Sequence, residues 1–90
     1  MKSLLRQALL HMLKAEAWPH SLAAPGWRAE AQGFQSQARD RYAPSMRQHL
    51  DVARLYAGAL KELPDAIDGL PPLAVAQVCP MTLDELLAEE

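Results

Sequence analysis

The sequence predicts an all-α domain: a small bundle of three main helices, an extended proline-rich segment and a short capped helix at the C-terminal end. Three observations lead to this fold class. Apolar residues recur at helical spacing through the first 63 residues. Four prolines then fall within 17 residues, and a capping-box pattern follows them. With 90 residues, half of them apolar, we expect one small folded domain.

The first helix is predicted over residues 3–17, because Pro19 ends the helical pattern. Its apolar positions cover about half of the helix circumference, and Leu10 lies outside even that arc. A stripe this wide cannot be buried against a single neighbour. The helix therefore needs cover from more than one side.

The second helix is predicted over residues 27–42, with one narrow apolar stripe and polar residues elsewhere. A third helix is predicted over residues 45–63, starting near Pro44, which suits a first helical turn. Gly58 weakens this helix by about 1 kcal/mol relative to alanine, which suggests that a neighbouring helix approaches closely there. The third helix is the expected centre of the core.

Residues 64–81 show no helical period and are expected to wrap over the bundle in an extended form. The last helix is predicted over residues 82–89, because Thr82 and Glu85 have the spacing of a structural capping box. Five apolar residues of the extended segment are expected to anchor it to the bundle: Ile67, Leu70, Leu73, Val75 and Val78.

Charge and cysteine content predict a cytoplasmic protein without a membrane span. The formal net charge is −2, but nine basic and four acidic residues lie before position 62, and seven acidic and no basic residues follow. A single cysteine cannot form an intrachain disulfide. No apolar run approaches the roughly 20 residues that a membrane-spanning helix needs.

Candidate catalytic and metal-binding residues are few. Cys79 could act as a nucleophile, or bind a metal with His11, His20 and His49, but the short ligand spacings of metal sites are missing. Cys79 is flanked by Val78 and a proline, and its acidic neighbours disfavour a thiolate. We therefore predict a packing role for Cys79 and no catalytic residue, metal or cofactor. An enzyme built on Cys79 and a histidine is the weakest of the hypotheses.

The order of several short motifs resembles a bacterial family, domain of unknown function twenty-nine. The motifs are HMLK (11–14), GWR (26–28), PSMR (44–47), LYAGA (55–59), GLP (69–71) and CPMTL (79–83). The resemblance is to the C-terminal two-thirds of the family, and we expect this chain to lack the further N-terminal helical region that members carry. It implies an all-helical bundle and no established activity.

The preferred functional hypothesis is a non-catalytic protein-interaction module. If a preceding helical region is missing, the wide apolar arc of the first helix should keep an uncovered face. Self-association or a protein partner would cover it, and an inhibitory or antitoxin-like small subunit is one concrete version. The expected partner interface consists of Leu4, Leu5, Leu9, Leu10, Met12 and Leu13.

The alternative hypothesis is a weak nucleic-acid-binding protein. Three basic residues of the predicted third helix are spaced by seven and share one line of that helix, and two arginines precede them. Asp51 interrupts the stripe, and the acidic C-terminal segment could neutralise it. The candidate contacts are Arg39, Arg41, Arg47, Arg54 and Lys61.

Overall fold

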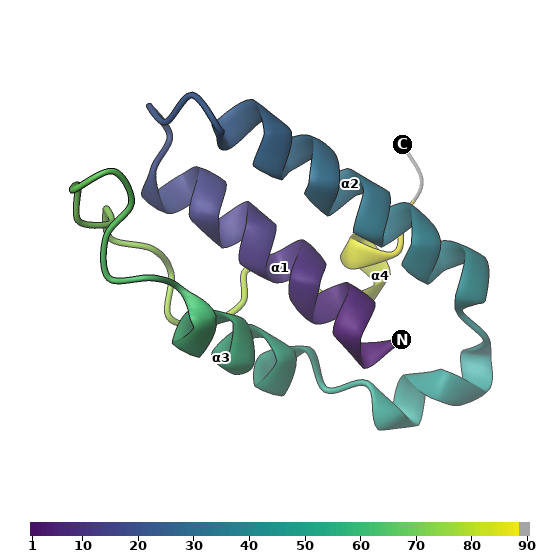
Figure 1. Ribbon diagram of the computed structural model, residues 1–90. Helices are drawn as coiled ribbons and strands as arrows, with labels where there is room; N and C mark the ends of the chain where they lie inside the picture. The colour runs from purple at the N-terminus through teal and green to yellow at the C-terminus, as the bar shows by residue number, and fades with distance from the viewer. Residues whose placement is uncertain (89–90) are drawn as a thin grey trace.

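The protein is helical throughout its main body, as the computed structural model in Figure 1 shows for residues 1–88. The elements are α1 (Lys2–Ala17), α2 (Ala24–Arg41), a 3-10 helix η1 (Pro44–His49), α3 (Val52–Glu62) and α4 (Leu83–Leu86). Within these residues there is no strand, and only an isolated bridge joins Ile67 and Leu70. The predicted all-α fold class is confirmed. No helix of the described chain combines the length and apolarity that crossing a bilayer requires.

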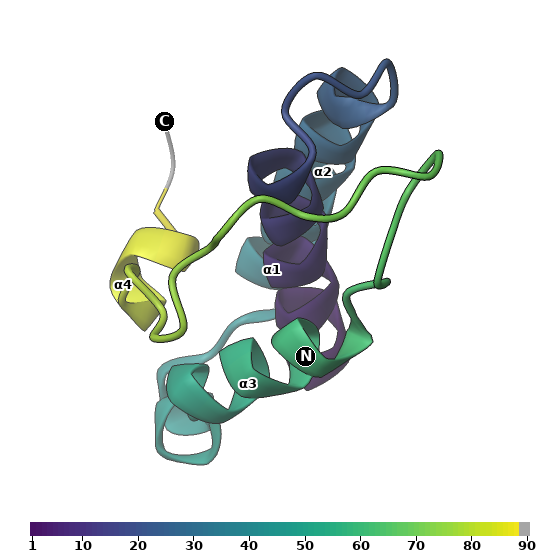
Figure 2. The same cartoon turned by 90° about the vertical axis from the view of Figure 1, so that its left-hand side faces the viewer.

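Helix α1 is the element around which the others are arranged. It packs against both α2 and α3, with α2 running antiparallel beside it (Figure 1). The extended segment 64–81, called the wrap below, crosses the end of α1 and leads to α4 (Figure 2). Leu5, Leu9 and Leu13 of α1 are at most 2% exposed. Burial of each leucine contributes about 1.5–3 kcal/mol, so α1 carries much of the core.

Helix α2 begins three residues earlier than predicted, at Ala24. Pro25 and Gly26 lie in its first turn, where the missing N–H of a proline costs no helical hydrogen bond. The sequence prediction of a helix over residues 27–42 left this proline outside the helix. Because the first turn of a helix tolerates proline, α2 can begin before Pro25.

The prediction of one continuous third helix over residues 45–63 is wrong. The 3-10 helix η1 ends at His49, and α3 begins only at Val52. Asp51 caps α3, because its carboxylate accepts a hydrogen bond from the backbone N–H of Arg54 at 3.3 Å. The break divides the predicted helix into two elements with different axes, as Figure 1 shows.

Three hydrogen bonds tie the wrap to the helices. The indole Nε1 of Trp18 donates to the carbonyl of Leu70 at 2.9 Å. The backbone N–H of Leu73 donates to the carbonyl of Ala17, also at 2.9 Å. Farther along, the hydroxyl of Tyr56 on α3 donates to the carbonyl of Ala76 at 2.6 Å. The wrap lacks regular structure of its own, so these contacts fix its path.

The wrap contains one tight turn, at Asp68 and Gly69. Both residues have positive φ, 54° and 78°, and the flanking Ile67 and Leu70 exchange two backbone hydrogen bonds of 3.0 Å. Positive φ at both central positions is the geometry that Asp-Gly pairs favour in two-residue hairpins. The turn reverses the chain beside the end of α1.

Helix α4 begins with a complete capping box. The Thr82 hydroxyl accepts from the Glu85 backbone N–H at 3.2 Å, and the Glu85 carboxylate accepts from the Thr82 backbone N–H at 3.0 Å. The helix ends at Leu86, earlier than the predicted span of 82–89, whose last residue lies outside the described residues. Leu83 and Leu86 are buried in the core.

Replacing Gly69 by alanine tests the turn. No heavy atom would meet the added Cβ within 4 Å, so only backbone strain at φ of 78° opposes the change. We expect Gly69→Ala to lower the free energy of unfolding by about 1 kcal/mol in urea denaturation. Gly33→Ala, at a helical position that is equally open, should raise it instead. Equal effects of the two variants would contradict the assigned turn.

Replacing Tyr56 by phenylalanine tests the attachment of the wrap. Burial, and secondarily the charge of Glu16, raises the pKa of the Tyr56 phenol above its ordinary value near 10. As the pH rises past the ordinary pKa near 10, the unfolded chain loses the phenolic proton before the folded chain does, so the free energy of unfolding falls. At pH 7 we expect Tyr56→Phe to cost about 1 kcal/mol through the lost hydrogen bond.

The pH dependence of stability in the alkaline range distinguishes the loss of the Tyr56 hydrogen bond from a general change in packing. Between pH 9 and 11 the free energy of unfolding of the wild type should fall more steeply than that of Tyr56→Phe, because only the wild type carries the shifted group. Parallel pH profiles in chemical denaturation would show that Tyr56 is not held as a neutral donor.

Candidate functional site

The leucine face proposed from the sequence as a partner interface lies mostly inside the protein. Leu5, Leu9, Leu10 and Leu13 are buried, and Leu4 and Met12 are partly buried against the same core. The expectation of an uncovered face is therefore wrong for the four buried leucines. The cover that the sequence assigned to a partner comes from α2, α3, the wrap and α4.

An apolar groove lies instead at the C-terminal end of α1. Two segments far apart in sequence form it: residues 17–21, from the last residue of α1 onward, and residues 67–73 of the wrap. Its volume is about 400 Å³, within the usual range of ligand pockets. We call it the Trp18 groove. Its lining residues are Ala17, Trp18, Pro19, His20, Ser21, Ile67, Asp68, Leu70, Pro71 and Leu73.

Leucines expected to anchor the wrap are exposed at this groove. Leu70 is 62% exposed and Leu73 is 56% exposed, while Leu22, which directly follows the loop wall, is fully exposed. Of the other predicted anchors, Val75 packs against the core but Val78 is exposed. Hydrogen bonds and the partial packing of Val75, Cys79 and Met81 hold the wrap, while Leu70 and Leu73 stay exposed.

Trp18 connects the groove to the core. Its side chain is 4% exposed, and its bond to the Leu70 carbonyl spans 52 residues of sequence. A second hydrogen bond, from the backbone N–H of Leu73 to the carbonyl of Ala17, joins the wrap to the end of α1. Because both walls are tied by hydrogen bonds, the groove has a defined shape before any ligand arrives.

The five basic residues expected to contact nucleic acid do not share one helix. Arg39 and Arg41 end α2, Arg47 lies in η1, and Arg54 and Lys61 lie in α3. The break at Leu50 and Asp51 removes the helical line that the spacing of seven implied. The stripe expected on the third helix is therefore not a feature of this fold.

Two of these arginines hold the C-terminal segment. Arg39 donates to the Ala88 carbonyl at 3.0 Å, and the Arg47 guanidinium donates to the carboxylate of Asp84. That hydrogen bond, followed by the charge of Asp84, raises the pKa of Arg47. Both side chains are more than half exposed, so the pair contributes little stability. The acidic C-terminal segment thus engages part of the basic surface.

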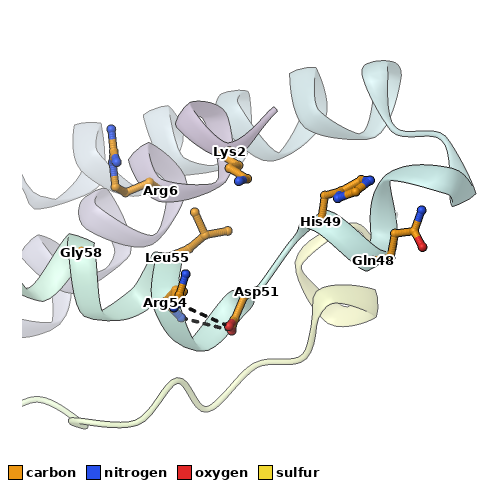
Figure 3. A pocket seen from close by; sticks show the side chains of 8 residues that line it. All are labelled: Lys2, Arg6, Gln48, His49, Asp51, Arg54, Leu55 and Gly58. Atoms are coloured by element: carbon orange, nitrogen blue, oxygen red, sulfur yellow. Dashed lines mark hydrogen bonds and ion pairs between the residues drawn. The ribbon is translucent and has the colours of Figure 1, made fainter.

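A second pocket, the cationic pocket, lies at the other end of α1. Figure 3 shows Lys2 and Arg6 of α1, and the start of α3 with Asp51 and Arg54 beside them. The pocket has a volume of about 390 Å³. Its lining residues are Lys2, Arg6, Gln48, His49, Asp51, Arg54, Leu55 and Gly58.

The cysteine and the histidines are dispersed. Cys79 is partly buried against the core, and its thiol donates to the Met81 carbonyl at 3.3 Å. His11 bridges α1 and α2: Nδ1 lies 2.7 Å from the Gln7 carbonyl and Nε2 lies 2.7 Å from the Glu30 carboxylate. Within residues 1–88 no three His, Cys, Asp or Glu side chains come together as metal ligands would.

Sequence reasoning missed both pockets because each joins distant segments. Most residues of the Trp18 groove fell between the first two predicted helices or were expected to anchor the extended segment. Lys2 and Arg6 of the cationic pocket were counted only in the overall charge. The one available signal for the groove was the mixture of leucines and prolines in an extended segment, since such a segment cannot bury all its apolar side chains on one side.

Comparison with known proteins identifies the family. The model of the family "Domain of unknown function DUF29" matches residues 1–90. No curated protein and no solved structure matches the chain significantly. The expected restriction to the C-terminal two-thirds of the family is slightly off, because the match extends over all the residues of the chain. The family prediction itself is confirmed: this chain belongs to the DUF29 family.

Proposed function

We propose that this protein is a non-catalytic interaction module that binds a segment of a partner protein in the Trp18 groove. The observation that carries the proposal is the exposure of Leu70 and Leu73 beside a preformed apolar groove. Exposed apolar side chains that gather at one concave surface are typical of docking sites. The sequence favoured the same class of module, and the proposal moves its interface from the α1 leucines to the groove.

The chemistry of the groove indicates the kind of segment it binds. Its walls supply leucine, isoleucine and proline surface, which suits apolar anchor residues. Asp68 lies at the tight turn that forms one edge, and Asp65 precedes it, while residues 62–90 contain no lysine or arginine. A partner segment with two apolar anchors next to a lysine or arginine therefore complements the groove.

Selection of peptides from a random twelve-residue display library tests this proposal. We expect peptides that share two apolar residues and an adjacent base, and their affinities can be measured by fluorescence anisotropy. The double variant Leu70→Ser, Leu73→Ser should bind them at least tenfold more weakly, because about 1–2 kcal/mol is lost per leucine contact. Val78→Ser removes another exposed residue of the wrap, outside the groove lining, and should bind like the wild type.

The result decides between the groove and other surfaces. Circular dichroism verifies that all variants remain helical before binding is measured. Peptides that bind the double variant as tightly as the wild type would place the interface elsewhere. Failure to enrich any peptide would remove the proposal.

The substitution Asp68→Asn tests the charge component separately. Asparagine tolerates the positive φ of this position, so the turn should be kept while the charge is lost. We expect the affinity for base-containing peptides to fall about threefold at low salt and to depend less on ionic strength. An unchanged salt dependence would show that Asp68 does not face the bound base.

A further inference from the structure

We infer that the cationic pocket binds the dianionic phosphate group of a small phosphate monoester. This inference is independent of the proposed partner binding, because the pocket and the Trp18 groove lie at opposite ends of α1. A helix of 16 residues is about 24 Å long, which separates the two sites. The inference rests on three features: the positive charge of the lining, the loose ion pairs of its two arginines, and the apolar surface that Leu55 adds.

The charges that line the pocket do not cancel. Lys2, Arg6 and Arg54 supply three positive charges, and Asp51 supplies the one negative charge. The Asp51 carboxylate is also the cap of α3, which directs one of its oxygens to the Arg54 backbone N–H. The lining side chains therefore carry a formal surplus of two positive charges, although Arg6 Nε also lies 3.7 Å from the carboxylate of Glu62, which is outside the lining. A phosphate monoester carries close to two negative charges at pH 7.

The two guanidinium groups of the pocket make only loose ion pairs. Arg6 Nε lies 3.7 Å from a Glu62 oxygen, and Arg54 Nε lies 4.0 Å from an Asp51 oxygen. Arg6 Nε is buried and has no hydrogen-bond partner within the described residues, so Arg6 would meet a ligand through its terminal guanidinium nitrogens. Arg39 and Arg47, by contrast, donate hydrogen bonds to the C-terminal segment. The pocket arginines therefore retain donors that a phosphate can accept from, in the forked geometry that suits this group.

The shape of the pocket favours an organic phosphate over the bare ion. Leu55 is 8% exposed and adds apolar surface to the lining. Gly58 leaves room for the Arg6 stem, whose Cδ lies 3.4 Å from the place a Cβ would take. This is ordinary van der Waals contact with a flexible side chain, and it is the one neighbour found near Gly58, where the sequence suggested a close helix approach. Gln48 and His49 add further polar groups at the rim.

Isothermal titration calorimetry of the full chain at low salt tests the inference. The probes are inorganic phosphate, O-phosphoserine and adenosine monophosphate, with chloride and serine as controls. We expect saturable binding of the phosphate probes in the micromolar to millimolar range, weakened by added salt. Tighter binding of one organic probe than of inorganic phosphate would identify which substituent the pocket accepts.

Matched variants distinguish this pocket from general attraction. The Arg54 side chain is 90% exposed, so Arg54→Gln leaves the core intact, and we expect it to weaken binding about tenfold. Lys61→Gln removes one charge from the same helix outside the pocket and should change the affinity less than twofold. Absence of saturable binding to every phosphate probe, or equal losses in the two variants, would overturn the inference.

Discussion

The burial of α1 by its own chain is the constraint on which the rest of the structure depends. The apolar arc of α1 is too wide for one neighbour, and the structure covers it with α2, α3, the wrap and α4 in turn. Leu5, Leu9 and Leu13 meet these elements and lie at the centre of the core. A 90-residue chain has little apolar surface to spare, so using four elements to cover one helix leaves the wrap with few apolar contacts of its own.

That shortage explains how the wrap is held and why it exposes leucines. Trp18 and Tyr56 donate hydrogen bonds to the carbonyls of Leu70 and Ala76, and these bonds hold the wrap where the predicted packing of Leu70 and Leu73 is missing. A segment fixed through its backbone can turn its side chains outward. The Trp18 groove is a direct consequence, because its exposed leucines belong to the segment that closes the core. The same constraint therefore shapes both the fold and the proposed interface.

The local signals in the sequence were sufficient for the fold class, for α1 and for the capping box of Thr82 and Glu85. They were insufficient for the third helix, because the apolar spacing continues across Leu50 and Asp51 while the backbone does not. Asp51 could have been interpreted as a helix cap, since aspartate is among the strongest N-cap residues. The two pockets could not be predicted, because each depends on which distant segments meet. Spacing along one chain segment does not contain that information.

Native-state hydrogen exchange of the α1 amides tests the central claim most directly. If the chain itself covers α1, the amides from Leu9 to Leu13 should exchange only through global unfolding, and they should do so equally at low and high protein concentration. Faster exchange in α1 than in α2, or protection of α1 that grows with protein concentration, would contradict the account. Such a result would mean that another molecule supplies the cover that the structure assigns to the wrap and its neighbours.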